Sequence, residues 1–187
     1  RGRRGDPVDI LREVADELGL QLGQDGASGR VGRATVELSV RGRATNPQLS
    51  VTASLPRPLG LGLSMRRRAD SNTLELAADG VEIAASTPDL SGWEIRAHKQ
   101  IEATELLGPR VRQALGALGG GARTEVVVDD AGCRALSTGW LRDPAWLRQH
   151  VLSVVRVAGV LDSETAKFAL ADTMDVLSET HPSVDDV

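Results

Sequence analysis

Aromatic side chains are almost absent from this chain of 187 residues, which has no tyrosine, one phenylalanine and three tryptophans. Aromatic residues form the stacking platforms of proteins that bind single-stranded nucleic acid, and they dominate the binding energy of many protein interfaces. Their scarcity argues against single-strand nucleic-acid binding. It also means that valine, leucine, isoleucine and alanine must form the core of the folded protein.

Lysine is also rare. Lys99 and Lys167 are the only two, so 20 of the 22 basic residues are arginines. The formal net charge is −4, which is the wrong sign for a dedicated DNA-binding protein. An excess of arginine, alanine, glycine and valine over lysine, tyrosine and phenylalanine is typical of GC-rich bacterial genes. We therefore expect a bacterial origin and no nucleic-acid partner.

Cysteine and long apolar runs are missing as well. Cys133 is the only cysteine, so the chain forms no internal disulfide, as is usual in a reducing compartment. No apolar run approaches the roughly 18 residues that span a bilayer, and no secretory segment is present. These absences favour a cytoplasmic location.

The first residues leave one alternative open. Arginines at positions 1, 3 and 4 would suit the cytoplasmic flank of a removed membrane helix, as in a membrane-tethered parent protein. The simpler interpretation is that residues 1–5 are a disordered basic terminus. Residues 181–187 are expected to form an acidic C-terminal tail.

Between Leu20 and Ala97 the hydrophobic residues alternate with polar ones, which predicts consecutive β-strands. The clearest strand covers residues 33–41, and the alternation also predicts strands at residues 48–55 and 59–65. Asp79-Gly80 predicts a two-residue hairpin turn. Because no helix separates these strands, we expect a mostly antiparallel sheet, arranged as a meander of about six strands.

Helical periodicity lies on both sides of this region. Asp-Pro pairs at residues 6–7 and 143–144 are suited to begin helices, and Gly19 is suited to end the first. A middle helix is predicted over about residues 102–118, with an interruption at Gly108-Pro109. Asp162 or Ser163 would cap a final helix, and a second hairpin, at residues 126–140, precedes the last helical region. The sequence therefore predicts one α+β domain over residues 6–180.

No stretch carries a motif that is specific to catalysis, a cofactor or a metal. The three glycines at 119–121 follow a helix instead of preceding one, so they indicate a helix stop and not a phosphate loop. His98, His150 and His181 show no ligand spacing. Cys133 would need a neighbouring imidazole to act as a nucleophile, and nothing in the spacing supplies one. We predict no catalytic, cofactor-binding or metal-binding residue.

The outer face of the central strands is unusual because its side chains are small. Small side chains let another layer approach a sheet closely, and that layer is either the protein's own helices or a partner. Packing of the protein's own helices on this face is the ordinary interpretation. The predicted helices also need the apolar face, so self-association or partner docking on the small-residue face is the alternative. The residues of this predicted interaction face are Ser39, Ser50, Thr52, Ser54, Gly60, Gly62 and Ser64.

Two further groups are candidate sites. Arg66, Arg67 and Arg68 are the only internal charge cluster and could contact phosphate or anionic lipid, although such a cluster also discourages pairing at a sheet edge. His98, Lys99 and Glu102 lie where a strand passes into a helix, where they could serve a pocket or simply form an exposed polar connection.

These features support three hypotheses of different classes. The leading one is a non-enzymatic protein–protein interaction or assembly module, with a protein partner or self-association. The second is an enzyme or small-molecule-binding domain whose pocket lies between sheet and helices, near His98, Lys99 and Glu102. The third is an anionic-surface binder that uses residues 66–68.

Overall fold

The computed structural model describes residues 7–43, 46–67, 79–84, 87–118, 124–138 and 143–179. Several predicted features lie outside these ranges. They are the terminus 1–5, the tail 181–187, Arg68, the strand expected before Asp79 and the glycines at 119–121.

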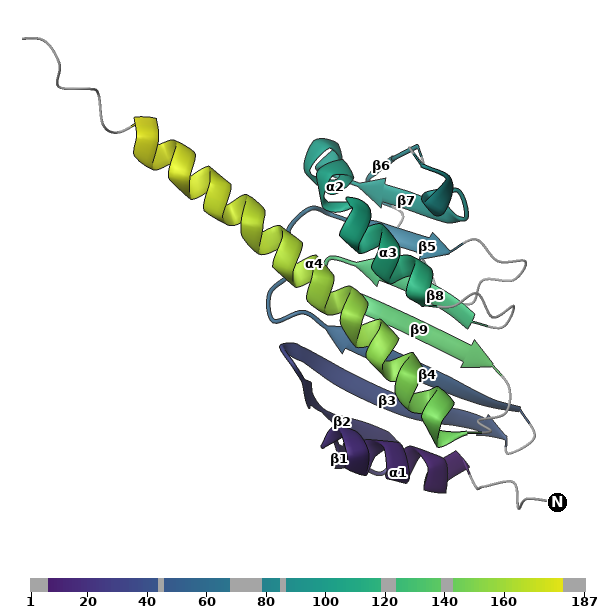
Figure 1. Cartoon of the computed structure of the whole chain (residues 1–187). Helices are drawn as coiled ribbons and strands as arrows, with labels where there is room; N and C mark the ends of the chain where they lie inside the picture. Colours follow the sequence, from purple (N-terminus) through teal and green to yellow (C-terminus); the bar gives the residue numbers. More distant parts are fainter. Residues whose placement is uncertain are drawn as a thin grey trace, which may run out of the picture.

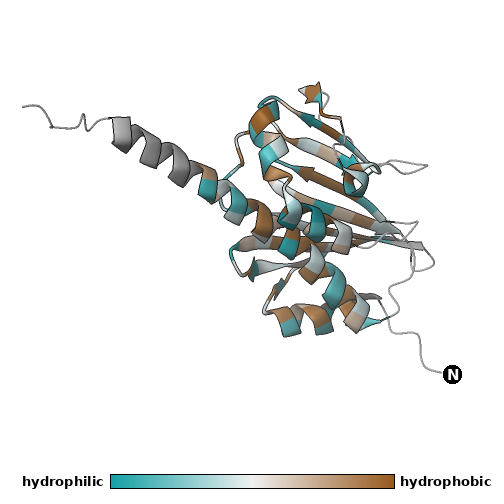
Figure 2. Cartoon of the chain, turned by 45° about the horizontal axis from the view of Figure 1, so that its top comes forward, coloured by the Kyte–Doolittle hydropathy of each residue, from teal (hydrophilic) through white to brown (hydrophobic). Residues whose placement is uncertain are grey.

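The described residues form a single antiparallel sheet, as the alternating sequence predicts. Its strand order is β1-β2-β3-β4-β9-β8-β5-β7-β6, and every neighbouring pair is antiparallel. Alternating apolar and polar positions are visible along the strands in Figure 2. The bounds are β1 (Gln21–Leu22), β2 (Gly26–Val31), β3 (Ala34–Arg43), β4 (Asn46–Ser54), β5 (Ser64–Arg67), β6 (Val81–Glu82), β7 (Trp93–Ala97), β8 (Thr124–Asp129) and β9 (Gly132–Thr138).

The helices pack together on one face of this sheet (Figure 1). α1 contacts β2, α4 crosses β3, β4 and β9, and α2 lies against β7. α3 packs beside α4. Their bounds are α1 (Pro7–Leu18), α2 (Gln100–Leu106), α3 (Pro109–Ala117) and α4 (Pro144–Glu179), with a short 3-10 turn at Pro88–Leu90. The α+β architecture predicted from the sequence is therefore confirmed.

The predicted helix interruption at Gly108-Pro109 is present. α2 ends at Leu106 and α3 begins at Pro109, because proline has no amide hydrogen to continue the first helix but suits the first turn of the second. The expected helix start at Asp162 or Ser163 is absent. α4 continues through both residues, and the Ser163 hydroxyl donates back to the Val160 carbonyl at 2.9 Å instead of capping a new helix.

The strands do not form the simple meander that was predicted. The hairpin of β8 and β9 is inserted between β4 and β5, which the chain order alone would make neighbours. β8 carries three consecutive valines, Val126, Val127 and Val128, and all three are buried. A strand that is apolar on both faces is stabilised by a central position, which explains why the hairpin lies inside the sheet.

The segment from Leu59 to Leu63 was predicted as a strand but forms a loop. Gly60 and Gly62 have φ angles of 71° and 62°, in the left-handed region that interrupts an extended strand. The Asp130 carboxylate accepts hydrogen bonds from the amides of Gly62 and Leu63, both at 2.8 Å. The loop is thus attached to the β8–β9 turn while its leucines reach the core.

The core fills the space between the helices and the sheet. β3, β4 and β9 contribute their inward residues, among them Val36, Val51 and Ala135, and α4 contributes Leu147 and Leu161. Beyond Phe168, the last core-packed residue described on α4, this helix extends past the sheet (Figure 1). Among the described residues, no helix is both long enough and apolar enough to cross a membrane.

Because α4 closes the core, truncating one of its buried leucines should destabilise the whole domain. Leu147 is fully buried, so Leu147→Ala should lower the free energy of unfolding by about 2–5 kcal/mol. The matched change Leu152→Ala, on the same helix at a side chain that is 37% exposed, should cost less than about 1 kcal/mol. Urea denaturation checks both values, and equal losses would show that α4 does not pack as described.

Candidate functional site: the open face of the sheet

The face of the sheet opposite the helices carries no covering element among the described residues. α1, α2 and α4 contact the other side and α3 packs beside α4, so alternate residues of each strand point away from the core. On β3, Val36 and Leu38 are buried, whereas Glu37 between them is exposed. We call this side the open face.

The strand register brings open-face residues into rows that run across the sheet. One row contains Glu37, Thr52 and Arg134, from β3, β4 and β9. The next row contains Ser39, Ser50 and Leu136. A third row contains Thr35, Ser54 and Gly132.

The small residues of the predicted interaction face are only partly brought together. Ser39, Ser50, Thr52 and Ser54 lie side by side on β3 and β4. Ser64 is buried on β5, beyond β9 and β8, and it pairs with Asp129 and Arg96. Gly60 and Gly62 belong to the loop after β4, so the predicted strand position for these two glycines is wrong. That the remaining residues bind a partner stays a prediction.

The small side chains leave a hollow of about 760 Å³ in the open face. Its floor is formed by hydroxyl side chains on three adjacent strands, Ser28, Ser39, Ser50, Thr52 and Ser54. Longer polar side chains also line it, namely Asp25, Glu37, Arg41, Gln48 and Arg134. The hollow therefore combines a shallow polar floor with charged groups of both signs.

Four of these charged groups have no ionic partner within the part of the chain that the structure describes. Asp25, Glu37, Arg41 and Arg134 form no ion pair with any described residue. The charged residues farther across the open face, on β5 and β7, do form ion pairs with each other. Arg66 and Arg96 both approach Glu94, the former at 2.6 Å. Among the described residues, the charges of the hollow are therefore not neutralised by ion pairs.

The arginine cluster does not form one patch in the described region. Arg66 faces the open side in register with Val127, and its Nη2 atom pairs with Glu94 Oε2. Arg67 is in register with the buried Trp93, so it alternates to the opposite face of the strand. The interpretation of residues 66–68 as an anionic-surface site stays a prediction, with one of its described members already ion-paired.

His98, Lys99 and Glu102 lie at the junction of β7 and α2, as predicted, and all three are exposed. The backbone amides of His98 and Lys99 both donate to the Leu61 carbonyl, at 3.1 and 3.0 Å. Directly beneath, the space between helices and sheet is occupied by packed aliphatic side chains such as Leu106. The hypothesis of a pocket at this junction stays a prediction.

Cys133 is buried on the face of β9 that is turned toward the helices. Burial raises the pKa of its thiol far above the ordinary value, and the charge of nearby Asp129 raises it further. A nucleophilic cysteine needs the opposite environment, accessible and with a lowered pKa. The location therefore favours a structural role for this thiol.

We expect the Cys133 thiol of the native protein to be almost inert to a thiol-reactive dye at neutral pH, because the side chain is buried and protonated. Labelling should become rapid and reach one dye per chain only when denaturant is added. Rapid labelling of the native protein would show instead that β9 opens readily or that the thiol is accessible.

Sequence reasoning missed one buried polar contact. The Ser137 hydroxyl lies 3.4 Å from His150 Nε2 and 3.0 Å from the Thr124 hydroxyl. The His150 ring stacks on Trp146 with 5.0 Å between ring centroids. Both Ser137 and His150 are buried at the interface of α4 and the sheet, which indicates a contact that positions the helix.

Burial lowers the pKa of His150 below its ordinary value of 6.5, because desolvation disfavours the charged ring. The unfolded chain therefore binds a proton more readily than the folded one, so this residue reduces stability as the pH falls below about 6.5. His150→Gln keeps a hydrogen-bonding group but cannot take up a proton.

From about pH 7.5 to about pH 5.5, the wild type should lose more unfolding free energy than His150→Gln, measured by urea denaturation. This window lies above the range in which ordinary carboxyl groups titrate. Parallel pH profiles for the two proteins would contradict the assignment of this loss of stability to His150.

Comparison of the chain with models of protein families, with curated proteins and with solved structures gives no match.

Proposed function

We propose that this protein is a non-enzymatic interaction module that docks a protein partner on its open face. The observation that carries this proposal is the hollow with small hydroxyl residues on its floor and charged side chains among its lining. An antiparallel sheet commonly exposes one face to water. Here the short side chains of β3 and β4 would also let a second layer approach closely.

The edges of the sheet are a less favourable binding site for a partner than its open face. The edge strands β1 and β6 have two residues each. Edge strands this short present few unpaired backbone groups, so they are poor templates for the addition of a further strand. Side-chain contacts across the face are therefore the better supported mode of binding.

The composition agrees with a polar mode of recognition. The chain has almost no aromatic residues, which are the usual energetic centres of interfaces. A face rich in serine, threonine, arginine and glutamate would instead rely on close approach, hydrogen bonds and charge pairing. Such an interface depends on matching charge positions more than on apolar area.

Photo-crosslinking in cells that express the protein tests this proposal. A photoreactive amino acid that replaces Gln48, at the rim of the hollow, should form a protein adduct after irradiation. The matched control replaces Gln113, which is exposed on α3 in the helix layer.

We expect an adduct from position 48 and little or none from position 113, as read by gel mobility and mass spectrometry. Mass spectrometry also identifies the captured protein, whether another copy of this chain or a different one. Absence of any adduct from position 48, or equal capture from both positions, would count against docking on the open face.

A further inference from the structure

We infer that the partner is a second copy of this chain, docked open face to open face about a two-fold axis that lies over β4 and runs parallel to it. This inference rests on the proposed function and names its partner. It follows from the register, because open-face residues on the two sides of β4 are complementary to each other in charge and in size.

The geometry of such an axis decides which residues meet. A half-turn about a line above β4 places each residue of β3 over the residue of the partner's β9 in the same row, and the reverse. Residues of β4 itself meet their own copies. The strands of the two sheets then run nearly parallel, which is the aligned arrangement of stacked sheets.

The charges on either side of β4 are opposite. Glu37 and Arg134 both pair with Thr52, one from each side, so they lie two strand spacings apart, about 10 Å. Within one chain they do not reach each other, and neither forms an ion pair with another described residue. The two-fold rotation brings Glu37 of one copy over Arg134 of the other, and it does so twice.

The residues two strands away from β4 on each side also carry opposite charges. Here the positive charge lies on the β3 side of β4 and the negative charge on the β9 side. Arg30 on β2 and Asp129 on β8 belong to the row of Ser54, at equal numbers of strands from β4. The rotation therefore also places Arg30 over Asp129. Both charge pairs are complementary under one axis, whereas a shift of the axis by one strand would lose the pairing of Glu37 with Arg134.

The same rotation also places a large side chain of one copy opposite a small side chain of the other. In the neighbouring row, Ser39 lies on the β3 side of Ser50 and Leu136 on the β9 side. The rotation places the half-buried Leu136 of one copy over the hollow around Ser39 of the other. Leu136 of each copy would thus fill space that the small Ser39 of its partner leaves open.

The axis itself runs over Ser50, Thr52 and Ser54, which would meet their own copies. These side chains are short enough for the two sheets to approach closely, and each hydroxyl can both donate and accept a hydrogen bond. A large or charged residue at these positions would collide with itself. The residues present on β4 are of the kind that a two-fold contact tolerates.

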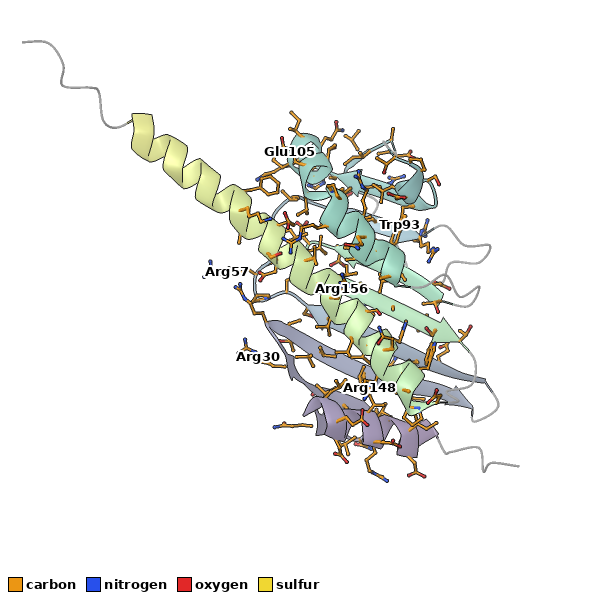
Figure 3. All side chains as sticks on the ribbon, in the orientation of Figure 1. Arg30, Arg57, Trp93, Glu105, Arg148 and Arg156 are labelled. Atoms are coloured by element: carbon orange, nitrogen blue, oxygen red, sulfur yellow. The ribbon has the colours of Figure 1, made fainter. Side chains whose placement is uncertain are left out.

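Charge reversal tests the inference. The wild type should sediment as a dimer of twice 19.8 kDa across a concentration series. Glu37→Arg and Arg134→Glu should each weaken the dimer by about a hundredfold, because like charges would then face each other twice. As matched controls, Glu13→Arg on α1 and Arg156→Glu on α4, whose arginine lies on the helix layer (Figure 3), should leave the dimer unchanged.

Mixing the two reversed variants gives the sharpest result. In a mixed dimer, the introduced arginine of one chain faces the introduced glutamate of the other, and the unchanged Arg134 faces the unchanged Glu37. Equal amounts of the two variants should therefore form heterodimers with near wild-type stability, and the chain with both reversals should form homodimers. This rescue also demonstrates that each variant is folded.

A wild type that stays monomeric, or reversed variants that dimerise as well as the wild type, would overturn the inference. So would failure of the mixture to restore the dimer. The proposed function has a separate readout. Capture of a different protein from position 48 by a monomeric wild type would retain docking on the open face and discard the second copy as its partner.

Discussion

The pairing of β4 with β9 is the contact on which the rest of this structure depends. It joins two parts of the sheet that are far apart in the chain, with seven residue pairs from Gln48↔Thr138 to Ser54↔Gly132. α4 follows directly after this region and packs across β3, β4 and β9. One register therefore positions the inward residues against α4 and, on the other side, the polar rows of the open face.

Alternation made β3 and β4 predictable, because their inward residues are aliphatic and their outward residues polar over positions 34–41 and 48–54. Pro109 likewise marked the division between α2 and α3. The loop at residues 59–63 was not predictable from this signal. Its leucines alternate like those of a strand, but the glycines between them adopt positive φ angles and the Asp130 carboxylate holds the backbone in place.

The residues of the candidate site divide in the same way. Those on strands that are adjacent in the sequence could be predicted, and those placed by the pairing of distant strands could not. Ser39, Ser50, Thr52 and Ser54 were identified because neighbouring strands in the sequence are also neighbours in the sheet. Arg134 and Leu136 were missed, since their position beside β4 depends on a pairing across about 80 residues of chain. Nothing in the hairpin's own sequence specifies which strand it joins, apart from the apolar β8 that favours a central position.

The insertion of the β8–β9 hairpin has a consequence for how the chain acquires its structure. β4 is complete by residue 54, but the strand that covers its free edge ends only at residue 138. During synthesis, the ribosome must release more than half of the polypeptide with that backbone edge still unpaired. Contacts between such distant segments slow folding and prolong exposure to aggregation. For that interval the nascent chain presents a strand edge that the finished domain covers with β9.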